Sequence, residues 1–248
     1  MPHLEWLTAR PIAHRGLHDA SRGVIENTAS AFSAAITGGY GIECDLQISA
    51  DGEAMVHHDD ALGRLTEGSA RLAELKATDI QAIHFKNCTD RILALGDLCE
   101  LVGGRTTLLL ELKSRFDGDV RLVQRCAQVL SGYTGPVAIM SFDPALVEAI
   151  HHAAPRMTRG IVAERYYRHP EWDRLSAWQK RRMAWLLHAP QSRPHFLAYS
   201  VKDLPAVPPS IAHTFFGWPL LAWTVRTEDD RKVAARWADQ MIFEGWRP

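Results

Sequence analysis

The sequence has no long hydrophobic run, and this absence excludes a membrane-spanning protein. No window of the 248 residues approaches the roughly 18 uninterrupted apolar residues that a transmembrane helix needs. The first sixteen residues, MPHLEWLTARPIAHRG, also lack a basic flank followed by an apolar core, so we expect no export signal. The sequence therefore predicts a cytoplasmic protein without stable membrane insertion.

Cysteine is scarce, and neither sign of charge is in excess. Cys44, Cys88, Cys99 and Cys126 are widely spaced and form no C-x-x-C pair, which excludes a zinc knuckle and a disulfide framework. Lysine and arginine number 28 against 29 acidic residues, a net charge of -1. We therefore expect no nucleic-acid partner, and any anion-binding site must be local.

What the sequence does contain is a regular alternation of short apolar runs and helix-like stretches. Hydrophobic residues make up 46% of the chain, enough for a substantial core. Eight candidate strands lie at 10–14, 41–48, 106–113, 136–142, 158–163, 195–200, 219–225 and 239–245. Helix-like stretches occupy 27–37, 95–102, 117–131, 143–153, 171–188 and 228–238.

Eight strands in 248 residues leave about 30 residues for each unit, the length of one βαβ repeat. This favours an α/β fold of the TIM (β/α)₈ barrel class, in one domain spanning 1–248, over two separate domains. The chain ends just after the eighth strand, so we expect the last helix to be missing or short.

One segment interrupts the alternation after the second strand. In GIECDLQISADGEAMVHHDD, two β-like runs flank an Asp-Gly pair, which is a strong hairpin signal. A turn centred near residue 51 would place Glu43 opposite Asp59 and Asp45 opposite His57. The sequence thus predicts a β-hairpin insertion that brings carboxylates and histidines together.

Three carboxylates lie near the ends of two predicted strands. Glu43 and Asp45 are two residues apart, so both point to one face of their strand, and Glu111 lies on the next one. Buried carboxylates require compensation, and an all-oxygen set of this kind suits Mg²⁺ or Ca²⁺ better than zinc. The alternative is a structural ion network with Arg15 and Lys113 and no metal.

The same residues resemble the signature of the glycerophosphodiester phosphodiesterase family. The family pattern of HRG, PENT, AF, IExDV, DG and HD corresponds to AHRG, IENT, AF, IECDL, DG and HHD over about 50 residues. LLLELK, MSFD, AWTV and the ending ADQMIFEGWRP extend the resemblance over nearly the whole chain. It implies a TIM-barrel enzyme that hydrolyses small glycerophosphodiesters to glycerol 3-phosphate and an alcohol. The implied site consists of catalytic His14 and His58, metal ligands Glu43, Asp45 and Glu111, and phosphate-binding Arg15 and Lys113.

Several assignments stay open at this stage. His57 stands beside His58, although the family spacing to Asp59 favours His58. Glu26 would orient His14 or Arg15, and Asn27 either supports the site or only caps a helix. The family's usual proline is replaced by Ile25.

Two aromatic features also have two readings. Trp223, at the end of a predicted strand, either forms a wall against the substrate or packs inside the barrel. Segment 166–190, YYRHPEWDRLSAWQKRRMAWLLHAP, is aromatic and basic, and the sequence favours an ordinary barrel helix over a helix that lies on a membrane.

Two other functions are compatible with these residues. One is a lysophospholipase D-like or other lipid phosphodiesterase that uses the same site. The other is a noncatalytic phosphodiester-binding barrel, which is disfavoured because every matching position is filled. The sequence does not indicate the headgroup, the native metal or the oligomeric state.

Overall fold

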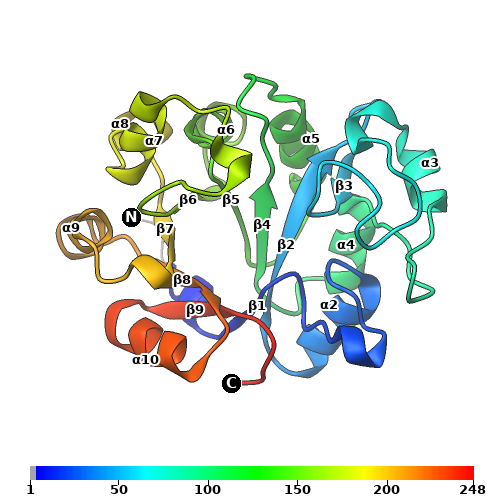
Figure 1. Ribbon diagram of the computed structural model, residues 1–248, viewed down its shortest axis with the longest axis horizontal. Helices are drawn as coiled ribbons and strands as arrows, with labels where there is room; N and C mark the ends of the chain where they lie inside the picture. The colour runs from blue at the N-terminus through cyan, green and yellow to red at the C-terminus, as the bar shows by residue number, and fades with distance from the viewer. Residues whose placement is uncertain (1–3) are drawn as a thin grey trace.

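The computed structural model describes residues 4–248, which form a closed barrel of eight parallel strands with helices around it (Figure 1). Strand β1 pairs with both β2 and β9, and these two pairings close the ring. The barrel strands are β1 (Ile12–Ala13), β2 (Gly41–Ile48), β4 (Leu108–Leu112), β5 (Val137–Ser141), β6 (Thr158–Ala163), β7 (Phe196–Ser200), β8 (Leu220–Val225) and β9 (Gln240–Phe243). The predicted fold class and all eight predicted strands are confirmed.

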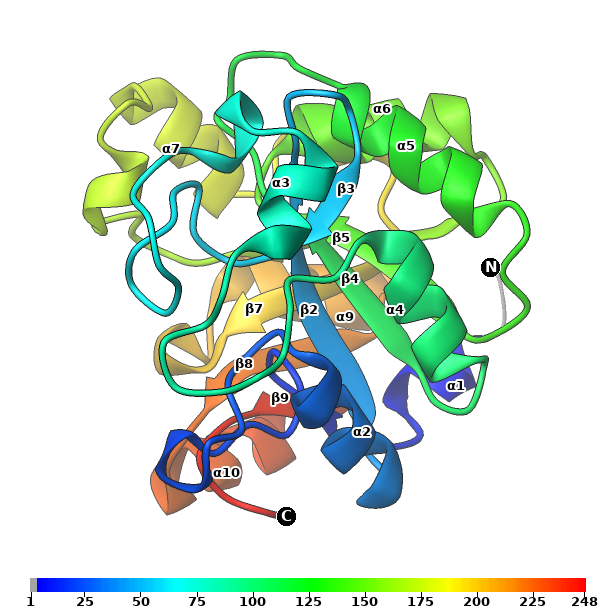
Figure 2. The same cartoon turned by 90° about the vertical axis from the view of Figure 1, so that its right-hand side faces the viewer.

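The hairpin after the second strand is present in the expected register. Strand β3 (Ala54–Val56) pairs antiparallel with β2, with Leu46 opposite Val56. The His57 amide donates to the Asp45 carbonyl at 3.0 Å, which continues the same register. Figure 2 shows β3 and α3 (Ala77–Ala82) side by side over the barrel, where the insertion has a small core of its own around Met55, Leu72 and Ile80.

Apolar side chains fill the barrel interior because alternate residues of each strand point inward. Leu109, Met140, Val162, Phe196 and Leu221 belong to this interior cluster. The short helix α1 (Glu5–Thr8) adds a fully buried leucine to the same cluster and covers the end where the strands begin. The opposite end, where the strands finish, is left for polar residues.

The outer layer differs from the predicted helices in two places. The helices are α2 (Ala29–Thr37), α4 (Leu95–Val102), α5 (Arg121–Leu130), α6 (Pro144–Ala153), α7 (Ala177–Ala184), α8 (Ala189–Ser192), α9 (Val207–Phe216) and α10 (Glu228–Trp237). Four 3-10 turns accompany them at Ala20–Arg22, Leu72–Glu74, Pro170–Trp172 and Val201–Asp203. As expected, no helix follows β9 in the described chain. Helix α9 was not predicted; it has two prolines near its start, where proline is tolerated in a first helical turn.

The second difference is that 171–188 does not form one helix. The segment contains the end of a 3-10 turn and α7, and it stops at His188, the residue before α8, with Leu186 at a positive φ of 53°. A left-handed residue of this kind ends an α-helix. The prediction of a single barrel helix here is therefore wrong.

Gly160 of β6 provides a test of the interior packing. A Cβ at this position would lie 2.3 Å from the ring of the fully buried Phe196 on β7. We expect Gly160→Ala to lower the free energy of unfolding by about 1 to 3 kcal/mol, because an overpacked core must shift. Gly96→Ala is the control, since an added Cβ at Gly96 in α4 would contact no neighbouring group within 4 Å. Alanine there should stabilise by about 0.5 to 1 kcal/mol. Urea unfolding measures both, and equal effects would contradict the packing described.

Candidate active site

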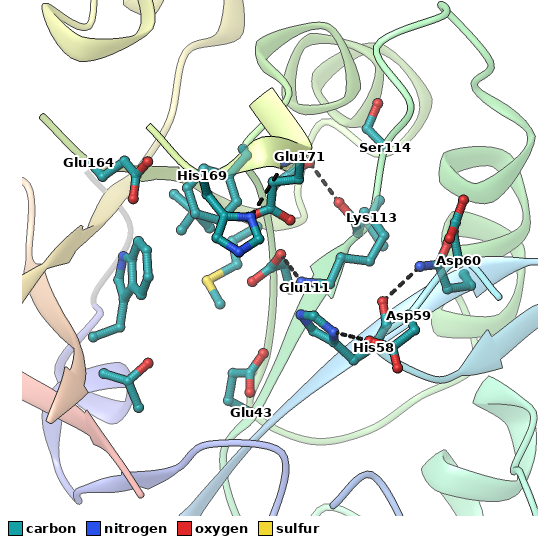
Figure 3. Close-up of a pocket in the computed structure, with 18 of the residues that line it drawn as sticks. Glu43, His58, Asp59, Asp60, Glu111, Lys113, Ser114, Glu164, His169 and Glu171 are labelled. Atoms are coloured by element: carbon teal, nitrogen blue, oxygen red, sulfur yellow. Dashed lines mark hydrogen bonds and ion pairs between the residues drawn. The ribbon is translucent and has the colours of Figure 1, made fainter. Parts of the chain in front are cut away.

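A cavity of about 680 Å³ opens at the end of the barrel where the strands finish (Figure 3). Parallel strands deliver their last side chains to this rim, so residues far apart in the sequence meet there. The sequence-predicted residues that line the cavity are His14, Arg15, Glu43, His58, Glu111, Lys113 and Trp223. Asp45, the remaining predicted residue, is buried beside them in contact with Lys113.

The three predicted metal carboxylates form one buried cluster. Asp45 and Glu111 are register partners on neighbouring strands β2 and β4, and Glu43 lies two residues before Asp45 on the same face. One oxygen from each of the three lies within 4.8 Å of the other two. The exposed fractions of Glu43, Asp45 and Glu111 are only 1%, 1% and 7%. Their charges are therefore removed from water and need partners.

Two cations neutralise part of this cluster. The Lys113 ammonium lies 2.8 Å from Asp45 and 2.5 Å from Glu111, and the Arg15 Nε lies 3.2 Å from Asp45. The Lys113 ammonium and the Arg15 guanidinium hold the pKa of Asp45 well below its usual value, against the opposing effect of burial. The same carboxylates raise the pKa values of Lys113 and Arg15, so both cations stay charged.

Glu43 is the carboxylate that these cations leave uncompensated. Its Oε2 accepts the Arg15 backbone N–H at 2.8 Å, but its buried Oε1 has no hydrogen-bond partner in the described chain. Burial, together with the charges of Asp45 and Glu111, raises the pKa of Glu43 well above its usual value. Three hard oxygen donors with an unpartnered buried oxygen fit a divalent cation better than a closed ion network.

Arg15 and Asn27 support this cluster with strained backbones. Both have left-handed φ angles, 56° and 58°, and the Asn27 amide donates to the Arg15 carbonyl at 2.9 Å. The Asn27 side chain also donates to Asp45 Oδ2 at 2.9 Å. Helix α2 is capped instead by Thr28, so the reading of Asn27 as a helix cap is wrong. Strain of this kind concentrates at functional sites, where the surrounding structure maintains it.

His14 is oriented by a residue from the last strand. Its Nδ1 lies 2.8 Å from Glu244 Oε2, so the carboxylate accepts the Nδ1 proton and leaves Nε2 toward Glu43, 4.0 Å away. Burial lowers the pKa of His14 to about 4, and the neutral ring is therefore the form present near pH 7. The pKa of Glu244 is lowered to about 2, with burial opposing and the His14 hydrogen bond favouring the shift.

The two neighbouring histidines have different surroundings. His58 lines the cavity, and its Nδ1 donates to Asp59 Oδ1 at 2.8 Å. His57 is buried, only 3% exposed, and its Nδ1 donates to the Asp59 carbonyl at 2.9 Å away from the cavity lining. The geometry therefore gives His58, and not its neighbour, access to a ligand in the cavity.

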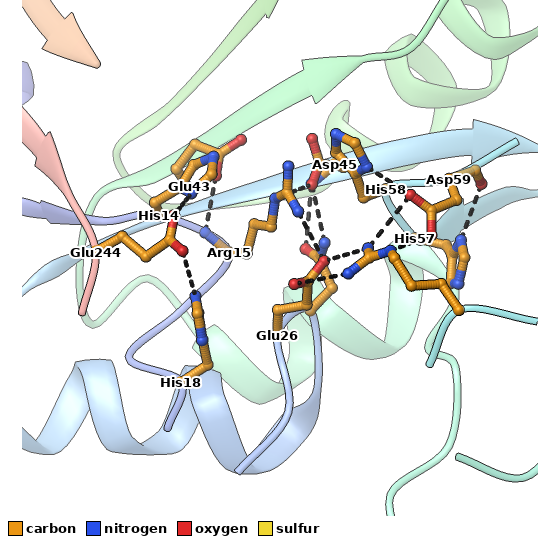
Figure 4. A network of polar contacts seen from close by, with 12 residues as sticks. His14, Arg15, His18, Glu26, Glu43, Asp45, His57, His58, Asp59 and Glu244 are labelled. Carbon is orange, nitrogen blue, oxygen red and sulfur yellow. Dashed lines mark hydrogen bonds and ion pairs between the residues drawn. The ribbon is translucent and has the colours of Figure 1, made fainter. Parts of the chain in front are cut away.

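Arg64 connects the two halves of the site. Figure 4 shows Arg15 and Glu26 in one half and His58 and Asp59 in the other. Its guanidinium donates to Asp59 at 2.6 Å and to Glu26 at 2.7 Å, and Glu26 in turn accepts from Arg15 at 2.7 Å. Glu26 thus orients Arg15, whereas His14 is held by Glu244. The chain of contacts links the residue that holds His58 to the cation beside the carboxylate cluster.

Aromatic side chains form one wall of the cavity. Trp223 lies edge-to-face against Phe142 with ring centroids 5.4 Å apart, and Trp172 is tilted against the same Phe142 at 4.8 Å. Phe116 completes the group with an edge contact to Trp172 at 6.0 Å. Trp223 both contacts the barrel interior and lines the cavity, and its contact with a substrate stays a prediction.

Sequence reasoning missed three residues of this arrangement: Glu244, Arg64 and Trp172. For Glu244 a signal was available, because it directly follows the eighth strand, at the same rim as the other site residues. Arg64 and Trp172 lie in long connections after the hairpin and after β6, where no periodicity places a side chain.

The family model described as the glycerophosphoryl diester phosphodiesterase family matches residues 14–245. A glycerophosphodiester phosphodiesterase from Caldanaerobacter subterraneus is 32% identical over 162 residues, 61% of this chain and 65% of that protein. Glycerophosphodiester phosphodiesterase 1 from Bos taurus is 41% identical over 75 residues, 29% of this chain and 22% of that protein. The matched parts thus span less than two thirds of either relative.

Solved structures share the fold over nearly the full chain. An Oleispira antarctica phosphodiesterase, solved with its product sn-glycerol-3-phosphate, superposes with a TM-score of 0.76 at 22% identity, covering 96% of this chain and 94% of that one. A glycerophosphodiester phosphodiesterase from Thermotoga maritima gives a TM-score of 0.70 at 20% identity, covering 94% and 92% of the two chains. Since the family model matches residues 14–245, which include every site residue, the chain belongs to the glycerophosphoryl diester phosphodiesterase family.

Proposed function

We propose that this protein hydrolyses small glycerophosphodiesters to glycerol 3-phosphate and an alcohol, with Mg²⁺ or Ca²⁺ held by Glu43, Asp45 and Glu111. The observation that carries the proposal is the buried carboxylate cluster beside a cavity that His14 and His58 also line. The family membership and the product bound by the Oleispira antarctica relative support the same substrate class. When bound, the divalent cation supplies charge neutralisation for the nonbridging phosphate oxygens.

Arg15 and Lys113 hold the substrate phosphate in this proposal. Both line the cavity, and both remain charged because the carboxylates beside them raise their pKa values. Their positive charge offsets the negative charge that grows on the phosphate oxygens in the transition state. The contacts to Glu26 and Asp45 fix the Arg15 side chain before substrate binds, so little ordering cost remains.

His14 and His58 move the protons. The nucleophile must lose a proton, and the departing alkoxide must gain one. The nucleophile is either water or a hydroxyl of the substrate's own glycerol, and in the second case water then hydrolyses the cyclic phosphate that forms. A neutral imidazole can accept the first proton and a protonated imidazole can supply the second. The carboxylates of Glu244 and Asp59 hold the Nδ1 atoms of the two rings and leave each Nε2 for this exchange. The proposal does not assign which ring acts as the acid.

Glu244 is a positioning residue in this scheme, and its substitution tests that role. We expect Glu244→Ala to lower kcat roughly 10- to 100-fold with little change in KM, because the His14 ring loses its orienting acceptor. Glu244→Gln should recover most of the activity, since its amide oxygen still accepts the Nδ1 proton. Steady-state kinetics on both variants measures the effect, and equal losses in the two would contradict an orienting role.

The aromatic wall favours a second candidate substrate. Phe116, Phe142, Trp172 and Trp223 give one side of the cavity an apolar surface, which a fatty acyl chain or an alkyl headgroup would contact. A lysophospholipid cleaved at the same bond would give lysophosphatidate in place of glycerol 3-phosphate. The carboxylate cluster would bind the metal ion and the histidines would transfer the protons in either reaction.

A product analysis distinguishes the candidates. Metal-loaded protein is incubated separately with glycerophosphocholine, glycerophosphoethanolamine and lysophosphatidylcholine, and the phosphate-containing product of each is identified by mass spectrometry. Release of glycerol 3-phosphate from the first two supports the proposal, and faster release of lysophosphatidate supports the lipid alternative. Saturable binding of all three without any product would overturn both and indicate a binding barrel.

A further inference from the structure

The connection between β6 and β7 carries exposed aromatic residues that no part of the site uses. Tyr166, Trp178 and Trp185 are 51%, 62% and 54% exposed. Other aromatic residues of the same connection are packed inward, where Tyr167 and Trp172 form a small core with Leu175 and Met183. The exposed rings are therefore not needed for packing, contrary to the ordinary barrel helix that the sequence favours.

Positive charge surrounds these rings. Residues 165–187 contain six lysines and arginines against two acidic residues, so the segment is positive by four charges in a chain of net charge -1. None of the six cations forms an ion pair in the described structure, whereas most cations of the active site do. Arg165 and Arg168 both lie over the Tyr166 ring, with their guanidinium carbons 4.9 and 4.5 Å from its centroid.

Helix α7 presents both kinds of residue on one face. Trp178, Arg181 and Trp185 are spaced three and four residues apart, which places them along the same side of a helix. Met183 lies on the opposite side and contacts the inward core. Both ribbon views place α7 at the outer edge of the molecule (Figures 1 and 2).

We propose that this surface, defined as Arg165, Tyr166, Arg168, Trp178, Arg181 and Trp185 and called the α7 patch, docks the protein on anionic lipid membranes. Tryptophan and tyrosine prefer the headgroup region of a bilayer, and each nearby cation adds electrostatic attraction to an anionic leaflet. The remainder of the chain is negative by five charges, so this segment differs in sign from the rest of the chain and complements such a surface. A protein partner without a strong negative field would leave the six cations unexplained.

The location of the α7 patch connects docking to the cavity. His169, Trp172 and Arg174, from the same connection, line the cavity. A docked molecule would therefore hold the cavity near the bilayer surface. No helix of the described chain is long and apolar enough to cross a bilayer, so the association is peripheral. This inference does not depend on the chemistry proposed for the barrel.

Vesicle sedimentation tests the proposal. The full chain is mixed with vesicles of phosphatidylcholine alone or with about 30% phosphatidylglycerol, at low and high salt. We expect binding to the anionic vesicles only, weakened by salt because the cations contribute through a screened field. Absence of binding to anionic vesicles at low salt would overturn the proposal.

Two double variants test whether the α7 patch is the surface that binds the vesicles. Arg168→Gln with Arg181→Gln should lower the vesicle partition coefficient by roughly five-fold for each cation removed. Trp178→Ala with Trp185→Ala should lower it roughly ten-fold or more. The matched control is Arg236→Gln with Trp237→Ala on α10, an exposed arginine stacked on a tryptophan at 5.1 Å outside the patch, and it should bind as the wild type does.

Three results would contradict the assignment of the α7 patch. One is equal loss of binding in the α10 control. Another is unchanged binding by both patch variants, with their melting temperatures also unchanged. The third is a wild type that does not bind vesicles and forms a dimer in solution, together with patch variants that are monomeric. The partner of the α7 patch would then be a second copy of this chain.

Discussion

Replacing Glu43 with glutamine is expected to lower turnover of glycerophosphodiesters about a thousand-fold or more while the barrel stays folded. Glutamine keeps the size of the side chain but removes one of three buried carboxylates that lie within 4.8 Å of one another. A bound metal ion contributes several kcal/mol of transition-state stabilisation, and each 1.36 kcal/mol changes the rate tenfold. Steady-state release of glycerol 3-phosphate measures the loss.

The folded state of this variant is a separate observable. Burial and the charges of Asp45 and Glu111 make ionised Glu43 unfavourable, so Glu43→Gln should melt no lower than the wild type without metal. With Mg²⁺ or Ca²⁺ added, the wild type should gain melting temperature and the variant should gain much less, because a ligand stabilises only the state that binds it.

Glu53→Gln is the matched control for Glu43→Gln. Glu53 is a partly exposed glutamate that pairs with Arg125 at 2.8 Å outside the cavity. It should keep both the metal response and the turnover. A Glu43→Gln variant that is fully active, or that gains melting temperature from metal as the wild type does, would contradict the assignment of the carboxylates.

Replacing His58 with alanine is expected to lower kcat by roughly 100- to 10,000-fold, the usual contribution of a general acid or base. The ring lines the cavity and its Nδ1 is held by Asp59, so its Nε2 is the atom available to a substrate. The carboxylate cluster is untouched by the change, and the metal-dependent gain in melting temperature should therefore persist. Single-turnover kinetics with saturating protein separates this loss from weaker binding.

His57→Ala is the comparison that the chain itself offers. His57 is buried and donates to the Asp59 carbonyl, away from the cavity lining. Its loss should cost about 1 to 3 kcal/mol of stability while the folded fraction keeps its turnover within a few-fold. If His57→Ala lost as much kcat as His58→Ala while remaining folded, the roles of the two histidines would have to be exchanged.

The arrangement of strands explains why so much of the site was predictable. Alternation of apolar and polar residues identifies barrel strands, and parallel strands place their last residues at one rim. Glu43, Asp45 and Glu111 could be grouped on that basis alone, and the hairpin register from Asp51-Gly52 correctly placed Asp45 opposite His57. These inferences use the two-residue alternation of side chains along a strand and one local turn signal. Neither depends on contacts between residues far apart in the sequence.

The residues that escaped prediction depend on distant contacts. Arg64 reaches Glu26 across 38 positions, and Glu244 reaches His14 across 230. No local pattern encodes either pair, because each partner is chosen by the folded barrel. The helix prediction for the β6–β7 connection was wrong for a related reason. The apolar residues of this segment suit a buried helix as well as an exposed surface. The folded structure separates the two groups: Tyr167 and Trp172 pack inward, whereas Trp178 and Trp185 are exposed to solvent.

The most direct test of the central claim is the metal dependence of glycerol 3-phosphate release. Wild-type protein is assayed on glycerophosphoethanolamine as purified, after removal of metal with a chelator, and after Mg²⁺ or Ca²⁺ is added back. We expect glycerol 3-phosphate release to stop when metal is removed and to return when a divalent cation is added. The Glu43→Gln variant should stay inactive under all of these conditions. Undiminished release from protein shown by elemental analysis to be free of metal would contradict the central claim.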